Sequence, residues 1–489
     1  MTTHITSGRN KVPLSARITW GSGGLVSYIM MNTLFALALP IYQVALKVDP
    51  VTLGLLMAIP RFVDLFFDPV MGNISDNTRT RWGRRRPYIL AGAIGAAILL
   101  PLLWMPPFHT QAGIVAYFLV VCVLYTFCYT IFEIPYTALG YELTDDYDER
   151  TRVLAWRMYL GFIGMLGMPW VYKLCLSPIF KDMADPGTPH EVVGARWVSL
   201  GLSAVILLAA VILVVRCRES VAHRNLEKIG MIQALKCTIQ NRAFMMLMGV
   251  NLVIRIGIAA VGAIPLYINL YYVCLGGHIM SAETLESSKG LAATIMGVGG
   301  TVAGLTSYIA LPLATWLSVR TSKRTTLMTA LGIALVGNAS MWFTFDPQHP
   351  WLQLSSAVVA NFGMMGCWLM MSSMVADICD EDELHTGLRR EGVYGASVAF
   401  TEKLAFTITT AITGFVLALA GFNTLTADTA GVPLAVIMRM KVLLVASQVV
   451  AIGLGILGCW LYPITRARSE ATRRILDARK GKDAINYKT

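Results

Sequence analysis

Charged residues are scarce in this sequence. Asp, Glu, Lys and Arg account for 14% of the 489 residues, whereas a typical soluble domain carries roughly 25%. Hydrophobic residues account for 55%, and the mean hydropathy is +0.60. A soluble protein of this length would cover its surface with charge, so we expect much of this surface to face lipid.

Several chemical motifs are also missing. The nine cysteines form no CxxC pair, so neither a zinc site nor a disulfide framework is predicted. The glycine-rich run GVGGTVAG at 297–304 lacks a following Lys-Ser or Lys-Thr and is better explained by close helix packing than by phosphate binding. No nucleophile–base pair or metal cluster is apparent, which argues against an integral membrane enzyme. We therefore expect no cofactor and no ATP-driven activity on this chain.

Long apolar runs, by contrast, recur along the whole chain. A membrane-spanning helix needs about 20 residues, and we find twelve candidate segments. They lie at 18–45, 51–76, 88–106, 112–141, 153–177, 197–216, 243–274, 290–318, 326–345, 351–377, 393–420 and 435–463. The predicted fold class is all-α: a polytopic membrane protein with twelve transmembrane helices in two six-helix halves.

The net charge of +11 is concentrated in alternate loops and at the termini. The intervening loops are poor in Lys and Arg, and two of them, 106–111 and 346–350, contain neither. Because positively charged loops remain in the cytoplasm, both termini are predicted to be cytoplasmic, in a bacterial inner membrane. The basic charge is thus a topology signal, and no nucleic-acid partner is expected.

The chain is predicted to have four parts. These are an N-terminal half at 1–216, a cytoplasmic linker at 217–242, a C-terminal half at 243–463 and a basic cytoplasmic tail at 464–489. Each half has a basic loop between its second and third helices, RTRWGRRRP in one and SVRTSKR in the other. Weak internal repeats are common in transporters, although the distribution of positive loops alone also makes two halves look alike.

Charged residues inside the predicted spans are functional candidates. An ionised side chain at the bilayer centre costs roughly 2.5–3.5 kcal/mol, so each needs a partner. The candidates are Asp64, Asp68, Glu133, Arg157, Arg255, Glu402 and Lys403.

The pair Asp64 and Asp68 lies in the second predicted span. Their i,i+4 spacing places both carboxylates on one helix face, about 5–6 Å apart at Cβ. Two carboxylates this close cannot both stay ionised without help, so a bound Na⁺, a shared proton or a lysine from another helix is expected. The alternative is a structural salt bridge with Arg61 or Lys403. Pro69 follows directly and cannot bond to the carbonyl of Leu65, which lies beside the pair.

A second polar pair lies late in the fourth predicted span. Tyr129 precedes Glu133 by one helical turn, so the two could bind solute hydroxyls or the cation; a purely structural network is the alternative. Lys403 is the natural counter-charge for the acids. Arg255 could pair with a substrate anion, or it could be a structural or snorkelling arginine.

Three long motifs resemble one known family. They are RFVDLFFDPVMGNISDNTRTRWGRRRPYIL, YTIFEIPYTALGYELTDDYDERTRVLAWR and ADICDEDELHTGLRREGVYGASVAFTEK. Together they resemble the glycoside–pentoside–hexuronide:cation symporters of the major facilitator superfamily, the family of the melibiose permease. The resemblance covers almost the whole chain and implies secondary active transport.

The resemblance implies a cation site and a substrate site. The implied cation site consists of Asp64, Asp68 and Thr130. The implied substrate-binding residues are Tyr28, Tyr129, Glu133, Arg157, Trp368 and Lys403.

Three positions depart from the family pattern. Phe67 replaces an asparagine beside the second acid and cannot ligate a cation, so both H⁺ and Na⁺ stay open as the coupling ion. Tyr28 replaces a sugar-binding acid, and Thr137 replaces a tryptophan that stacks on the sugar. The expected solute is a sugar, glycoside or uronide; an amphipathic lipid or other organic anion is the alternative, because lysolipid symporters share the second-helix acids and the eleventh-helix lysine.

The expected mechanism is cation-coupled symport by alternating access of the two halves, with the protein working as a monomer in the bilayer. A non-transporting membrane sensor is the remote alternative. Charged residues in the cytoplasmic loops are predicted to form gate networks. They are Arg84, Arg85, Arg86, Asp145, Asp148, Asp377 and Asp380.

Overall fold

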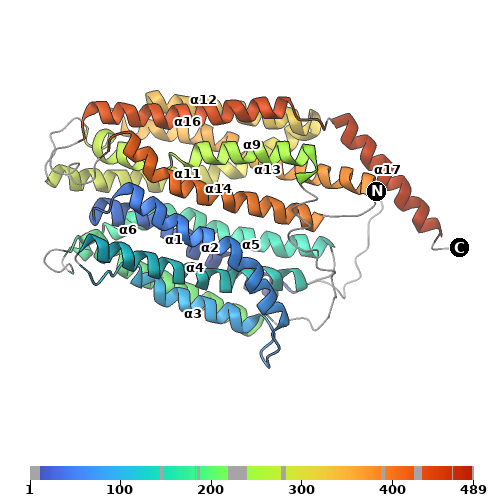
Figure 1. Cartoon of the computed structure of the whole chain (residues 1–489), viewed down its shortest axis with the longest axis horizontal. Helices are drawn as coiled ribbons and strands as arrows, with labels where there is room; N and C mark the ends of the chain where they lie inside the picture. Colours follow the sequence, from blue (N-terminus) through green and yellow to red (C-terminus); the bar gives the residue numbers. More distant parts are fainter. Residues whose placement is uncertain are drawn as a thin grey trace. The chain divides into compact units, whose positions relative to one another are not determined.

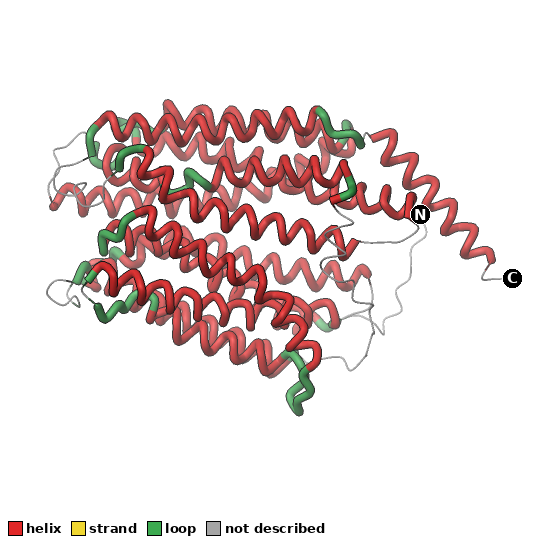
Figure 2. Tube along the Cα trace, in the orientation of Figure 1, coloured by secondary structure: helices red, strands yellow, loops and turns green. Residues whose placement is uncertain are grey.

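The computed structural model describes almost all of the chain as helix. The described residues are 12–108, 110–143, 147–181, 183, 188–217, 239–276, 282–386, 391–422, 432–464 and 466–486. Within them, helices are joined by turns and loops and no strand occurs (Figure 2). The all-α prediction is therefore correct.

The chain divides into two compact units. The first comprises Met1–Arg224, Lys289–Thr301 and Asn423–Thr429, and the second comprises Asn225–Ser288, Val302–Phe422 and Ala430–Thr489. The predicted linker 217–242 lies largely outside the described residues.

The helices of the first unit are α1 to α7 (Figure 1). Their bounds are α1 Leu14–Ala38, α2 Pro50–Asn77, α3 Arg86–Leu102, α4 Gln111–Glu142, α5 Tyr147–Gly167, α6 Val171–Cys175 and α7 His190–Arg216.

The second unit holds the later helices, with part of α11 belonging to the first. Their bounds are α9 Arg242–Ala259, α10 Ile264–Ile268, α11 Ala282–Arg320, α12 Lys323–Thr344, α13 Gln353–Thr386, α14 Glu391–Leu419, α16 Leu434–Trp460 and α17 Arg466–Asn486. Helix α17 shows that much of the predicted tail is helical.

Several helices begin where the sequence supplies a capping side chain. The Asp49 carboxylate accepts the N–H of Thr52 at 2.9 Å before α2. The Ser322 hydroxyl accepts the N–H of Thr325 at 3.0 Å before α12. Each cap satisfies a backbone donor that the first turn leaves unbonded.

Each of the twelve predicted segments overlaps a described helix. Among the described residues, ten helical stretches are long and apolar enough to cross a membrane, and α3 is shorter, with 17 residues. The predicted segment 153–177 is not one continuous helix: α5 ends at Gly167, and a 3₁₀ turn, Met168–Trp170, precedes α6. Pro169 in this turn lacks the N–H that a continuing α-helix needs.

The first span of each unit ends in a π-helical segment. Leu39–Ala45 follows α1, and Asn269–Val273 follows α10. The same short sequence, Ala-X-Pro-X-Tyr, occurs at 38–42 and at 263–267. Both tyrosines, Tyr42 and Tyr267, are fully buried. The sequence overlaps the π-helical segment in the first unit and precedes it in the second.

Small residues allow α1 to pack closely on its neighbours. A Cβ at Gly24 would lie 2.4 Å from the carbonyl oxygen of Arg157 on α5, and one at Gly140 on α4 would lie 2.0 Å from the ring of Trp20. Glycines at these contacts bring the backbones of α1, α4 and α5 together, and this positions the side chains described next.

The glycine-rich run in α11 also packs closely. Within the first unit, a Cβ at Gly297 would lie 2.8 Å from the Trp170 ring, and one at Gly300 would lie 2.2 Å from Pro169. The run therefore serves close packing, as expected from its sequence.

Candidate cation and solute site

Helices α2 and α4 bring Asp64 and Thr130 together. The Thr130 hydroxyl donates a hydrogen bond to Oδ1 of Asp64. Asp64 is only 2% exposed and Thr130 only 1%. Two predicted members of the cation site are thus in direct contact inside the first unit.

Arg61 is a third member of this cluster. Its Nη1 atom lies 3.7 Å from Oδ2 of Asp64, one helical turn along α2. Its guanidinium also lies over the rings of Phe35, at 5.0 Å, and Tyr129, at 5.9 Å. From the sequence, Arg61 is only one of two partners in the alternative salt-bridge interpretation, and the contacts with α1 and α4 depend on how the helices pack.

Asp68 lies one turn beyond Asp64 on α2 and is half-buried. Next to it, the ring of Phe67 packs edge-on against Phe127 at 4.7 Å between centroids. The side chain at position 67 therefore contributes an aromatic contact and no oxygen ligand.

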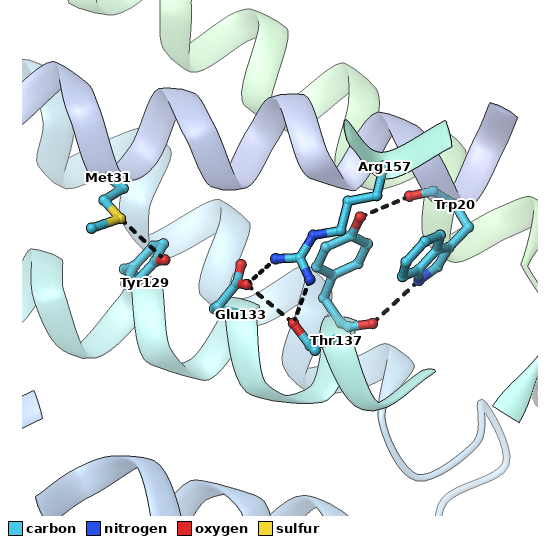
Figure 3. Close-up of polar contacts among 7 residues, drawn as sticks. Trp20, Met31, Tyr129, Glu133, Thr137 and Arg157 are labelled. Atoms are coloured by element: carbon cyan, nitrogen blue, oxygen red, sulfur yellow. Dashed lines mark hydrogen bonds and ion pairs between the residues drawn. The ribbon is translucent and has the colours of Figure 1, made fainter. Parts of the chain in front are cut away.

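Glu133, Arg157 and Thr137 form a second polar cluster between α4 and α5 (Figure 3). Nη2 of Arg157 lies 2.5 Å from Oε1 of Glu133, and its Nη1 donates to the Thr137 hydroxyl at 3.3 Å. Thr137 in turn donates to Oε1 of Glu133 at 3.1 Å. Oε2 of Glu133 is buried and has no hydrogen-bond partner among the described residues, so one strong acceptor remains available.

Aromatic residues hold this cluster in place. Trp20 stacks on Tyr136 at 5.1 Å, and the two side chains each donate to the other's backbone carbonyl, at 3.2 and 3.1 Å (Figure 3). The guanidinium of Arg157 lies 5.1 Å from the centre of the Tyr136 ring. Arg157 is thus held by a carboxylate and an aromatic face together.

Tyr129 lies on α4, one turn before Glu133, and Tyr28 lies on α1. The Tyr129 hydroxyl donates to the sulfur of Met31 at 3.7 Å (Figure 3). The half-buried Tyr28 ring lies against Gly164 of α5, where an added Cβ would come within 2.8 Å of it. Resemblance singled out Thr137 only as a substitution, and its hydrogen bonds to Glu133 and Arg157 were not predicted.

The second unit contains a comparable ion pair. Nη2 of Arg255 on α9 lies 2.5 Å from Oε1 of Glu402 on α14. Its guanidinium lies 4.1 Å from the ring of Trp368, and its Nε donates to Asn251 at 2.7 Å. Lys403 follows Glu402 and is half-buried. The sequence identified these residues but did not predict that Glu402 pairs with Arg255.

The predicted gate residues lie near the helix ends within each unit. Arg85 pairs with Asp76 at 3.0 Å, and Nε of Arg86 donates to the carbonyl of Val214 at 2.6 Å. Asp377 pairs with Lys323 at 2.8 Å.

The remaining predicted gate residues are less completely defined. Arg84 precedes α3, and Asp380 lies near the end of α13. Asp145 falls outside the described residues, and Asp148 lies in α5 without a described side chain.

The long apolar helices and the charged clusters among them are those of a polytopic membrane protein. The solved structure of a D-xylose–proton symporter is similar, with a TM-score of 0.57 and 15% identity over 93% of this chain and 98% of that one. At this identity the likeness shows the shared fold.

The family follows from the sequence. The family model described as MFS/sugar transport protein matches residues 20–466, and the chain belongs to this family. A putative glycoside/cation symporter of Escherichia coli (strain K12) is 26% identical, with 95% of each chain covered. A sodium-dependent lysophosphatidylcholine symporter 1-A of Danio rerio is 23% identical, covering 94% of this chain and 88% of the relative.

Proposed function

We propose that this protein is a cation-coupled symporter of a sugar, glycoside or uronide. The observation that carries the proposal is the contact between the buried Asp64 carboxylate and the Thr130 hydroxyl, with Arg61 beside them. A buried carboxylate in a membrane-spanning helix is a functional candidate, because placing an ionised side chain in the bilayer costs free energy and such residues usually serve a function. The name of the glycoside/cation relative supports the same activity.

H⁺ is the coupling ion that we favour over Na⁺. Hard metal cations are held by several oxygen ligands, and Phe67 supplies none. The Arg61 guanidinium, 3.7 Å from Asp64, would also repel a metal cation. Protonation of Asp64, in contrast, would weaken its ion pair with Arg61. A proton needs no shell of several oxygen ligands, so the residues present are sufficient. Asp68, on the same helix face, would share this proton.

Glu133, Arg157 and Thr137 are the proposed solute-binding groups. Oε2 of Glu133 can accept a hydrogen bond from a solute hydroxyl, while Arg157 can donate a hydrogen bond to a hydroxyl or carboxylate oxygen of the solute. Tyr28 and Tyr129 supply aromatic faces nearby. In the second unit, Trp368 and Lys403 are the solute-binding residues that the family resemblance implies.

A symporter of an amphipathic lipid or other organic anion is the second candidate. The observation in its favour is the half-buried Arg255, which stacks on Trp368 and could exchange Glu402 for a substrate anion. The lysophosphatidylcholine symporter relative fits this candidate.

Transport would follow alternating access, with two six-helix halves moving around a central solute. The ion pairs Arg85–Asp76 and Lys323–Asp377 would belong to cytoplasmic gates. We place the protein in a bacterial inner membrane with both termini in the cytoplasm, since its basic loops alternate along the chain.

Uptake into proteoliposomes tests this proposal. Sugars, glycosides, uronides and lysolipids are screened with an imposed H⁺ or Na⁺ gradient. We expect concentrative uptake of a sugar-type solute driven by H⁺, and its loss in Asp64→Asn and Asp68→Asn. Asp49→Asn is the matched control, since asparagine keeps the α2 cap. Undiminished concentrative uptake in both site variants would refute the coupling role, and uptake of lysolipids alone would select the second candidate.

A further inference from the structure

Two adjoining grooves lie in the second unit, where α12 begins and α17 follows α16. The first, called the polar groove after its arginine and hydroxyl side chains, is open and about 720 Å³ in volume. Its lining consists of two arginines, three hydroxyl side chains and two small or flexible apolar residues. They are Ser322, Arg324, Thr325, Met328, Thr329, Arg466 and Ala467.

The second groove is apolar and about 140 Å³ in volume. It runs between α11, α12 and α13 along small residues that include Ala314, Ala330 and Gly366. Thr329 lines both grooves, so they meet at this residue. A polar groove with arginines therefore opens next to a narrow apolar one.

The polar groove is positively charged. Its lining contains no acidic residue. Among the described residues Arg324 makes no ion pair, and its guanidinium donates to the backbone carbonyl of Trp460. Arg466 pairs with Glu470 at 2.8 Å and donates to the carbonyl of Thr321 at 2.5 Å. Arg324 is thus a half-buried cation that still has donors for an anion.

Nearby charges are already matched. Lys323 pairs with Asp377 at 2.8 Å, and Arg468 pairs with Glu381. Arg324 and Arg466 also line a cavity of about 290 Å³ together with Asp377 and Glu470. Asp377 pairs with Lys323 and Glu470 pairs with Arg466, so Arg324 is the cation of this group that makes no ion pair among the described residues.

The surroundings match a membrane interface. Trp316 also lines the apolar groove, is 51% exposed and carries the Arg320 guanidinium 4.3 Å above its ring. Tryptophan and arginine at a helix end are typical of the headgroup level. Helix α17 buries Thr472 and Leu476 while Ile475 is 45% exposed, and its sequence is rich in arginine, as in helices that lie at a lipid surface.

We propose that the two grooves together bind one anionic phospholipid. Its phosphate would lie between Arg324 and Arg466 and accept hydrogen bonds from Ser322 and Thr325. One acyl chain would enter the apolar groove past Thr329. Charge-assisted hydrogen bonds to arginine are strong and geometrically specific. The apolar groove can bury an acyl chain, which a lipid has and a free phosphate ion lacks. The lipid would attach the start of α17 to the start of α12.

Lipid retention on the purified full-length protein tests the proposal. Protein exchanged into detergent with phosphatidylglycerol or phosphatidylcholine is analysed by native mass spectrometry. We expect one phosphatidylglycerol to be retained in preference to phosphatidylcholine. One cation near a lipid surface corresponds to about a fivefold change in affinity, so Arg324→Gln and Arg466→Gln should each weaken retention by about that factor. Arg324→Lys should keep most of it.

Arg216→Gln is the matched control, because this exposed arginine ends α7 in the first unit and lines neither groove; it should leave retention unchanged. Ala314→Leu narrows the apolar groove and should weaken lipid retention while leaving any thermal stabilisation by inorganic phosphate intact. Equal retention of both lipids, or unchanged retention in Arg324→Gln, would overturn the proposal. Phosphate stabilisation without lipid retention would instead identify a free-anion site and overturn the lipid assignment.

Discussion

The Arg157 guanidinium and the Glu133 carboxylate are 2.5 Å apart and join α5 to α4. Their side chains are 27% and 16% exposed, so the pair is partly accessible and still shielded enough to matter energetically. Removing one partner leaves the other charge without its match in a membrane-spanning segment.

A double-mutant cycle on this pair should therefore show strong coupling. We expect Arg157→Gln and Glu133→Gln each to reduce solute affinity, with a coupling energy of about 1–3 kcal/mol between them, measured by calorimetric binding. The pair Arg468–Glu381 on α17 and α13 is the control. Since one partner is largely exposed, its coupling should be below about 1 kcal/mol and should not affect solute binding. Additive effects at 133 and 157 would contradict the assigned contact.

The hydroxyl of Thr130 should matter more than its size. Thr130→Val keeps the shape but leaves Asp64 without its donor, and a hydrogen bond to a charged group contributes about 1.5–3 kcal/mol. We expect the coupling-ion concentration for half-maximal uptake to shift by at least about tenfold. Thr130→Ser, which keeps the hydroxyl, should lie close to wild type. If the Thr130→Val and Thr130→Ser variants need the same coupling-ion concentration for half-maximal uptake, the hydroxyl is not part of the cation site.

The close approach of α1 and α5 should make Gly24 intolerant of a side chain. Because a Cβ there would lie 2.4 Å from the Arg157 carbonyl oxygen, Gly24→Ala must push the helices apart, at a cost of about 1–3 kcal/mol. The expected results are a lower melting temperature and weaker solute binding.

Gly201→Ala on α7 is the control for this change, since nothing lies within 4 Å of the added atom. Alanine is the better helix former by about 1 kcal/mol, so this variant should be neutral or more stable. Two variants with equal melting temperatures would argue against the tight contact at Gly24.

The ion pair at the start of α17 should respond to acid. The hydrogen bond and charge of Arg466 lower the pKa of the Glu470 carboxyl. A carboxyl with a lowered pKa stabilises the folded state above its ordinary pKa and loses this contribution as the pH falls through the lowered value. Proteolytic release of the tail should therefore be constant from pH 8 to about 5 and rise only in stronger acid. Glu470→Gln should remove that rise; an identical profile in the variant would show that another group controls it.

The sequence predicted the helical segments well because apolar length is a local property. It offered Arg61 as one alternative partner of Asp64, and that contact joins i,i+3 neighbours on one helix, which needs no knowledge of packing. The contact between Asp64 and Thr130 was available only through family resemblance, because it joins two helices.

Contacts between helices account for what was missed. Thr137 bonds to Arg157 across the α4–α5 interface, and Glu402 reaches Arg255 across α9 and α14. Helical periodicity shows which face a residue occupies but not which helix that face meets. The break at Pro169 was hidden for a different reason: the surrounding residues are apolar enough to resemble one continuous span.

The repeated Ala-X-Pro-X-Tyr turn at 38–42 and 263–267 has a consequence for the origin of the chain. In each unit a rare π-helical segment accompanies this sequence at the end of the first span, overlapping it in the first unit and following it in the second, and two unrelated helices would not be expected to share both features. This points to tandem duplication of a half-length ancestral gene, and replacing one five-residue sequence by the other should give a chain that still folds.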